Sequence, residues 1–132
     1  NSKISPLQYL TLLTSYTYVD KKNLEDFNDY IPKHKLVATL EVIPSEKSFF
    51  SISYRNVGDR TIFDRYGSFG LAGTDVILPK YQVIDFMTNY KLLEETLTFF
   101  ATVTNVFDEN YDDILGFSTR GRNYKIGLRF QF

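Results

Sequence analysis

The chain contains no cysteine and no tryptophan, one histidine and only four prolines among its 132 residues. Without cysteine, neither a structural disulfide nor a thiolate metal site can form. A single histidine and no cysteine leave no nucleophile–base constellation of the kind used in covalent catalysis. We therefore expect no catalytic residue, no metal site and no cofactor, and we do not expect an enzyme.

Neither positive nor negative charge is in excess, because the formal net charge is −1. Recognition of nucleic acid requires a clustered basic face, so we expect no nucleic-acid partner. No apolar run approaches the roughly 18 residues that a transmembrane helix needs. That absence does not exclude a membrane β-barrel, whose strands never produce such a run. The chain begins NSKISPLQ, with neither methionine nor a signal peptide, which predicts a processed product or part of a longer protein.

Aromatic residues are abundant, with 12 Phe and 10 Tyr, and apolar residues recur at every second position. This period-2 alternation is typical of half-buried strands, and no segment shows a helical period. The pattern predicts an all-β chain of six strands at about 7–18, 34–43, 49–58, 80–92, 97–107 and 123–132. One face of these strands is apolar and carries no charge, whereas the other holds Lys, Arg, Asp, Glu, Ser and Thr.

An uncharged face through six strands has two possible explanations. One Lys or Arg facing lipid at mid-membrane costs roughly 2–4 kcal/mol, so a lipid-facing surface would select this pattern. The core of a soluble barrel or sandwich would select it as well, with the two faces inverted. Alternation alone leaves both explanations open.

The connections between the predicted strands alternate long, short, long, short, long. VDKKNLEDFNDYIPK, DRTIFDRYGSFGLAGTDVILP and DENYDDILGFSTRGR are long, whereas PSEKS and EET are short. In an up-and-down meander this places every long loop at one end, as in outer-membrane barrels. Ten residues at about 3.3 Å, tilted near 45°, also span roughly 23 Å, close to the apolar band of such barrels.

Aromatic side chains gather near both ends of the predicted strands, as the girdles of membrane barrels do. The predicted girdle at the long-loop end comprises Tyr16, Tyr18, Tyr54, Tyr81 and Tyr124, and that at the short-turn end comprises Phe50, Tyr90, Phe99, Phe130 and Phe132. The smallest single-chain outer-membrane barrels have eight strands, so six strands predict a portion of a larger barrel. An open sheet would leave unpaired edges, which lipid cannot solvate.

Five segments in order resemble the C-terminal end of TonB-dependent outer-membrane receptors. They are IPKHKL (31–36), YRNVGDR (54–60), LPKYQVIDFMTNYKL (78–92), NVFDENYDD (105–113) and GFSTRGRNYKIGL (116–128). The residues that carry the family motif are Asn105, Phe107, Asp108, Gly116, Gly121 and Arg122. The chain departs from the family at Ser118, Thr119 and Arg120, where a proline is common.

The resemblance implies an antiparallel meander of about six long strands within a barrel of roughly 22 strands. Residues 1–132 would be its C-terminal strands, with the plug domain absent. The parent receptor would use TonB-coupled energy, received through its plug, to take up a scarce large nutrient: an iron-siderophore, haem, cobalamin or an oligosaccharide. The resemblance further implies a Gram-negative outer membrane, contact with its lipid, extracellular long loops and a periplasmic C-terminus.

The final strand fits the assembly signal of outer-membrane barrels at Lys125, Gly127, Phe130 and Phe132. An unpaired terminal strand with an aromatic anchor suits strand addition to the barrel-assembly machinery. Gly127 would allow a close backbone approach or local curvature. An ordinary amphipathic edge strand is the plainer explanation of the same residues.

The last long connection is acidic, with Glu109, Asp112 and Asp113 close together. Carboxylates are preferred calcium ligands, but the spacing matches no dedicated calcium loop, so we expect a solvated loop face. Arg120 and Arg122 are expected to balance this charge. If the loop meets a ligand, the candidate contacts are Glu109, Asp112, Asp113 and Arg120.

Two further positions on the polar side of the strands carry expectations. Asp85 could join a charge network inside the barrel with Lys91 or Arg129. His34, between two lysines at a strand entrance, is expected to be an interfacial polar residue. Two alternatives to the receptor stay open: a soluble barrel that binds lipid or another small molecule, and a small closed outer-membrane barrel.

Overall fold

The computed structural model describes residues 2–7, 9–20, 31–64, 66–67, 72–93 and 96–131. Within these residues, strands are the dominant element, and no helix is long and apolar enough to cross a membrane. The strands are β1 (Ser2–Leu7), β2 (Leu10–Tyr18), β3 (His34–Ser45), β4 (Ser48–Val57), β5 (Arg60–Asp64), β6 (Thr74–Leu78), β7 (Tyr81–Leu92), β8 (Leu97–Thr104), β9 (Asp112–Ile114), β10 (Phe117–Ser118) and β11 (Asn123–Phe130).

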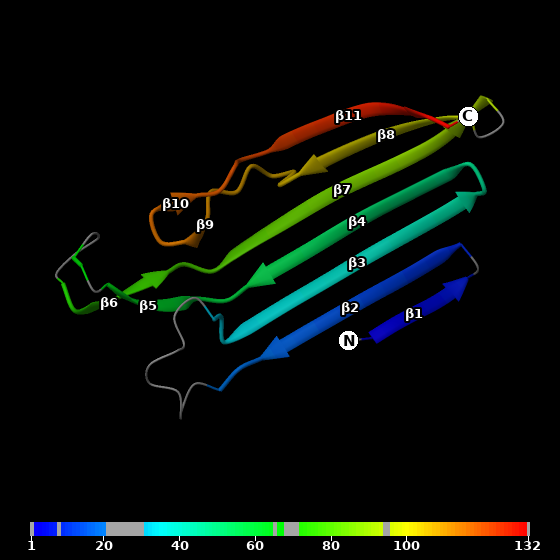
Figure 1. Ribbon diagram of the computed structural model, residues 1–132. Helices are drawn as coiled ribbons and strands as arrows, with labels where there is room; N and C mark the ends of the chain where they lie inside the picture. The colour runs from blue at the N-terminus through cyan, green and yellow to red at the C-terminus, as the bar shows by residue number, and fades with distance from the viewer. Residues whose placement is uncertain are drawn as a thin grey trace.

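Seven of these strands form one antiparallel sheet in the order β1-β2-β3-β4-β7-β8-β11. Figure 1 shows the sheet as a meander in which the long connections leave from one end and the tight turns from the other. The predicted all-β meander of long strands is therefore confirmed. In this sheet order β1 and β11 are the two edges, so the described residues form an open sheet.

Three details differ from the sequence prediction. The strand predicted at 7–18 begins only at Leu10, and a further short strand, β1, precedes it and pairs with it. The connection at 58–79, predicted as a loop, contains the β5–β6 hairpin, and the connection at 105–122 contains β9 and β10. These small hairpins extend the structure beyond the loop end of the main sheet (Figure 1).

The strand register joins the apolar faces predicted for the six strands into one continuous face of the described sheet. A single row crosses six strands through Leu12, Leu40, Ile52, Phe86, Val103 and Tyr124, each paired with the next. Side chains alternate between the two faces of a strand, so a matched register keeps the whole face uncharged. Large apolar side chains on it are solvent-exposed, among them Ile52 at 46% and Ile126 at 71%.

The buried core lies elsewhere. Val57, Tyr81 and Val83 form the buried hydrophobic cluster, with Tyr111 packed against it. These residues occupy the opposite, polar face of the sheet at its loop end. A soluble β-domain buries its apolar face and exposes its polar one, because burial of apolar area drives folding in water. Here the arrangement is inverted, and the only cluster of this kind in the described chain is where the loops cover the sheet.

Candidate functional site

A tight turn begins the last long connection and is built around Asn105. This residue is 4% exposed and has a left-handed backbone, with φ of 54°. Its side chain accepts a hydrogen bond from the backbone N–H of Glu109 and donates one to the carbonyl oxygen of Glu109, both at 2.9 Å. Its own backbone N–H donates to Oδ1 of Asp85 at 2.8 Å. Asn adopts the left-handed backbone conformation more readily than most residues do. An asparagine at position 105 therefore suits both the backbone conformation and the two side-chain hydrogen bonds.

Asp108 links the beginning of this connection to its end. Its Oδ1 accepts a 2.6 Å hydrogen bond from the backbone N–H of Arg122, and the Arg122 guanidinium donates to the carbonyl of Val106 at 3.3 Å. A Cβ at Gly121 would come within 2.5 Å of the same carboxylate oxygen, so only glycine leaves room for it. Asn105, Asp108, Gly121 and Arg122, which the family motif singles out, therefore form one structural unit.

The two remaining motif residues do not enter this unit. Gly116 has φ of 80°, a conformation that glycine adopts without a steric penalty, and it lies between β9 and β10. Phe107 is 74% exposed and projects from the turn. The positive φ explains why position 116 is a glycine. Among the described residues, no packing contact explains why position 107 is aromatic.

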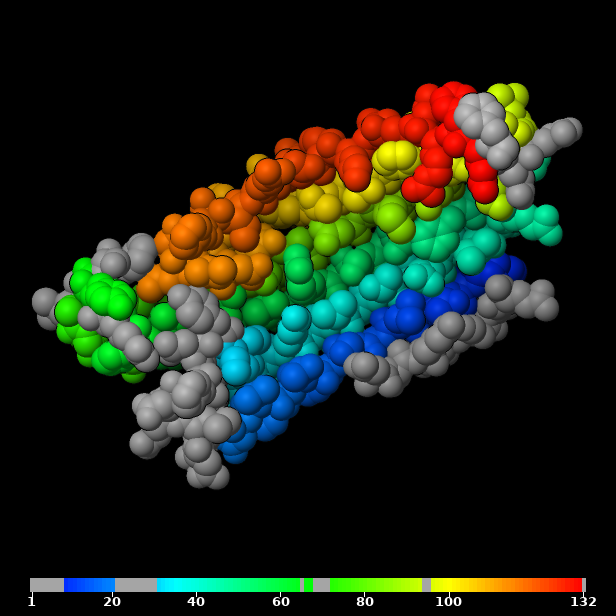
Figure 2. All heavy atoms as spheres, in the orientation of Figure 1, coloured from blue at the N-terminus to red at the C-terminus, as the bar shows by residue number. Residues whose placement is uncertain are grey.

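Arg60 ties the two large loop structures together. It is 3% exposed, and its guanidinium donates to the carbonyl oxygens of Asp112 at 2.6 Å and Asp113 at 3.1 Å. It also forms an ion pair with Oδ1 of Asp113 at 3.4 Å. Figure 2 shows the orange segment around β9 and β10 at the same end of the molecule as the green β5–β6 hairpin. We call this contact, made by Arg60, Asp112 and Asp113, the loop clamp.

Tyr81 supports the loop clamp from the sheet below. Its hydroxyl donates to Oδ1 of Asp113 at 2.5 Å, and its ring stacks on that of Tyr111 with 4.0 Å between centroids. The Arg60 guanidinium lies 5.2 Å from the centre of the Tyr81 ring. Tyr81 is 5% exposed and shares the polar face of β7 with Val83 and Asp85. The prediction that Tyr81 belongs to a lipid-facing girdle is therefore wrong, because its odd position on β7 turns it away from the apolar face.

The other predicted girdle residues lie on the apolar face, except Phe132, which is outside the described residues. At the loop end Tyr16, Tyr18 and Tyr124 are more than half exposed, and the Tyr16 hydroxyl lies 2.7 Å from Nδ1 of His34. Tyr54 is half-buried and accepts a hydrogen bond from Asn56 at 3.1 Å. At the turn end Phe50 and Tyr90 are exposed, and Tyr90 pairs with the half-buried Phe99. Their role as a girdle stays a prediction.

The acidic residues of the last connection make structural contacts, and their predicted contact with a ligand stays a prediction. Asp113 and the backbone of Asp112 belong to the loop clamp, and the backbone of Glu109 bonds to Asn105. No group of three or more potential metal ligands occurs in the described residues. The balancing cation for Asp113 is Arg60, not the expected Arg120, which is exposed, or Arg122, which bonds to Asp108 and Val106.

Gly127 in the last strand has a specific neighbour. A Cβ there would lie 2.8 Å from Cε1 of the Phe100 ring and would collide with Cζ, so the ring lies directly over the glycine. Lys125 and Phe130 pair with Thr102 and Leu97 of β8. Phe132, the terminal anchor of the predicted assembly signal, lies outside the described residues. The signal itself stays a prediction.

Arg60 and Tyr111 organise the loop end, and the sequence does not predict a role for either. Arg60 ends the YRNVGDR segment, so its position in a recognised motif was the available signal. Asp85 was expected to meet Lys91 or Arg129, but its carboxylate accepts the Asn105 N–H instead. A contact between a strand and the loop that follows the next strand leaves no trace in local sequence spacing.

Solved structures with this fold include siderophore receptors, one of them described as a receptor of the outer membrane. The chain is similar to FpvA of Pseudomonas aeruginosa bound to heterologous pyoverdines, with a TM-score of 0.79 and 18% identity over 98% of this chain and 18% of that one. It is similar to the ferric-catecholate import receptor Fiu of Escherichia coli K12, with a TM-score of 0.72 and 20% identity over 96% of this chain and 19% of that one.

A third similar structure is the siderophore receptor PirA of Acinetobacter baumannii, with a TM-score of 0.76 and 16% identity over 96% of this chain and 20% of that one. The chain thus spans about a fifth of the length of these receptors. No model of a known protein family matches the chain, and no curated protein matches it in sequence. The chain has the fold of a segment of a siderophore-receptor barrel, and the resemblance predicted from its motifs is confirmed at that level.

Proposed function

We propose that these 132 residues form the C-terminal part of the wall of an outer-membrane receptor that takes up a ferric siderophore. The observation that carries this proposal is the continuous, uncharged and exposed apolar face of the sheet. Its strands β3, β4 and β7 have 12, 10 and 12 residues, enough to cross an apolar band about 25 Å tall. In water such a face would be a large aggregation surface, whereas lipid covers it without cost.

The remaining surfaces fit this placement. The polar face would line the barrel interior, where a plug domain and the remaining strands of the receptor complete the structure. The clamped loops would lie outside the cell, and the turn end with β11 would lie at the periplasmic rim. There the last strand would present its edge to the barrel-assembly machinery. TonB would act through the plug, not through these residues.

The solved structures favour a siderophore over the other nutrients considered. Those with this fold include receptors described as binding pyoverdine, importing ferric catecholate or recognising ferric enterobactin. They are transport receptors, which supports a transport role over catalysis. The open order of the sheet counts against both alternatives, the soluble ligand-binding barrel and the small closed barrel, since β1 and β11 do not pair.

Uptake of labelled iron tests the function. Cells lacking the gene for the full-length protein, grown under iron limitation, would receive ⁵⁵Fe-pyoverdine, ⁵⁵Fe-enterobactin or ⁵⁵Fe-citrate in separate assays. We expect loss of uptake for at least one siderophore and its return on complementation. Unchanged uptake of every ferric siderophore, with loss of cobalamin or haem uptake, would contradict the proposed substrate class.

A second measurement tests the membrane placement by itself. We expect the full-length protein to sediment with outer membranes and to need detergent for extraction. Recovery of the protein as a monomer from buffer without detergent would contradict the proposed wall and favour a soluble binding barrel.

A further inference from the structure

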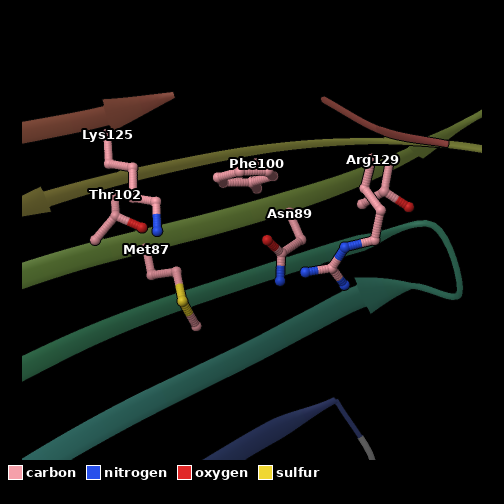
Figure 3. Close-up of a pocket in the computed structure, with 7 residues that line it drawn as sticks. Met87, Asn89, Phe100, Thr102, Lys125 and Arg129 are labelled. Carbon is pink, nitrogen blue, oxygen red and sulfur yellow. The ribbon is translucent and has the colours of Figure 1, made fainter. Parts of the chain in front are cut away.

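We propose that a basic hollow on the polar face of the sheet is the docking point for an acidic side chain, Asp or Glu, of the polypeptide that fills the barrel interior. This inference rests on the proposed function, which makes the polar face the inner one. The hollow has a volume of about 300 Å³ and is lined by Met87, Asn89, Thr98, Phe100, Thr102, Lys125 and Arg129. Figure 3 shows Lys125 and Arg129 reaching across it from β11, on either side of Phe100.

The charged side chains that line the hollow are all positive. Lys125 and Arg129 are positively charged, Asn89 offers an amide, and Thr98 and Thr102 offer hydroxyls, whereas no carboxylate lines the hollow. In the part of the chain that the structure describes, neither cation is within ion-pair distance of an acidic group. Hydrogen-bond donors are therefore in excess. Carboxylate oxygens accept such bonds from charged donors with about twice the strength of neutral pairs.

Among the described residues of this face, Asp85 and Glu41 are the acidic side chains to consider, and neither serves the two cations. Asp85 accepts the backbone N–H of Asn105. Glu41 pairs with Ser51, which pairs with Met87, so two strand spacings, roughly 10 Å, separate it from the rim of the hollow. The two cations therefore need a partner that β2 to β11 do not supply from their described residues.

The floor of the hollow keeps the two cations apart and in place. Lys125 and Arg129 are four residues apart on one strand, roughly 13 Å, with Gly127 between them. Because Gly127 has no Cβ, the Phe100 ring lies over it, and Nζ of Lys125 is 6.0 Å from the ring centre. An incoming carboxylate would meet charge from both sides and an apolar surface below. Phe100 and Met87 suit the methylene groups of an Asp or Glu side chain.

A segment of protein fits this site better than a free anion. The hollow opens onto a sheet face, and the chain spans about a fifth of the receptors that share its fold, so most of such a molecule remains to contact that face. A side chain held by its own backbone loses less entropy on docking than a free carboxylate does. We therefore assign the site to polypeptide, with small anions as an alternative outcome of the test.

Zero-length cross-linking of the full-length receptor tests the assignment. A water-soluble carbodiimide activates a carboxylate, the Lys125 amine attacks it, and an amide bond forms as the activating group leaves as a urea carrying the elements of water. After proteolysis, mass spectrometry should find Lys125 joined to an Asp or Glu outside residues 1–132. Lys125→Arg keeps the charge and should abolish that cross-link, and Arg129→Gln should lower its yield.

Lys35 is the matched control, because it lies on the same polar face but outside the hollow. We expect it to give no cross-link to the residue that captures Lys125. Cross-links from Lys125 only to acidic residues within 1–132, or only to glutarate added as a competing free acid, would overturn the proposal, as would no cross-link. Uptake of iron in the same cells separates the two ideas: normal uptake without the cross-link refutes the docking site alone, and the cross-link without uptake refutes the function alone.

Discussion

At the scale of single residues, side chains at the loop end form hydrogen bonds with backbone groups that have no partner in a strand. Asn105 closes a turn on Glu109 while its backbone N–H is held by Asp85, and Asp108 receives the N–H of Arg122. Both Asn105 and Asp108 have positive φ, at 54° and 59°. Two left-handed residues within four positions produce the sharp exit from β8 into the last long connection.

Asn105→Ala should loosen this turn. The substitution removes both side-chain bonds to Glu109 and leaves a non-glycine residue at φ 54°, which together cost about 1–3 kcal/mol. Hydrogen exchange at the Glu109 amide should become about five- to 150-fold faster, because 1.4 kcal/mol corresponds to a factor of ten. In Asn105→Gly the backbone conformation is tolerated but the side-chain bonds are lost, so the exchange rate should lie between those of the native protein and Asn105→Ala. Equal exchange in all three forms would show that the side chain does not hold the turn.

Gly127→Ala tests whether the glycine serves packing or recognition. The new Cβ would collide with the Phe100 ring and displace it, at a cost of about 1–3 kcal/mol for overpacking. We expect less folded receptor in the outer membrane, measured by heat-modifiable mobility on gels. The double variant Gly127→Ala with Phe100→Ala should recover much of the loss. If the assembly machinery reads Gly127 itself, removal of the ring will bring no recovery.

At the scale of elements, the strands were predictable because their alternation is strict and a matched register preserves it across the sheet. The β5–β6 hairpin was missed, although Thr61–Ile62–Phe63 and Val76–Ile77–Leu78 are β-formers on either side of a glycine-rich stretch. The glycines and charged residues of this long connection favoured the prediction of a loop. β9 and β10, with three residues and two, are too short for any period to appear.

The candidate site was predicted only in part, for a related physical reason. Asn105, Asp108, Gly121 and Arg122 could be named from their motif, because their contacts fall within one connection. Arg60 contacts residues 52 and 53 positions away, and such pairings are set by the sheet order. Tyr81 was misassigned because its type suits a girdle, whereas its register position on β7 decides which face it occupies.

Ile52→Arg and Ser53→Arg, neighbours on β4, compare the two faces of the sheet directly. Ile52 lies on the apolar face near the middle of the sheet, where an arginine facing lipid costs roughly 2–4 kcal/mol. Ser53 lies on the polar face and would lose one 3.0 Å hydrogen bond with Thr39, worth about 1 kcal/mol. The amount of folded receptor in outer membranes should fall strongly for the first variant and little for the second. The reverse order would mean that the faces are assigned the wrong way round.

At the scale of the whole molecule, the loop clamp makes two separate connections behave as one body. Arg60 begins the β5–β6 hairpin, and its partners Asp112 and Asp113 begin β9. The arginine side of the contact is buried, whereas the Asp113 side chain is half exposed, so salt weakens the ion pair but hardly affects the bonds from Arg60 to the two carbonyl oxygens. A ligand that moved one loop would therefore move the other.

Arg60→Gln should release the β9–β10 segment. Loss of two hydrogen bonds from the buried charged donor to carbonyl oxygens is worth about 1.5–3 kcal/mol, and the half-exposed ion pair with Asp113 adds little. Chymotrypsin should then cut after the exposed Phe117 at least about tenfold faster, because cleavage follows the population of the opened form. Arg120→Gln, at an exposed arginine of the same connection, is the control and should leave cleavage unchanged. Equal rates for both variants would refute the clamp.

The two edges of the main sheet have a practical consequence. Each of β1 and β11 presents a backbone edge that bonds to a neighbour on one side only. An unpaired edge is a template for another strand, and pairing shifted by one residue would turn charged side chains toward the apolar face. The sheet could therefore serve as the smaller fragment of a split-protein reporter. Co-expressed with the complementary strands, it should reconstitute a barrel only when both edges find their partners in register, and surface display of a tag in a loop would report that event.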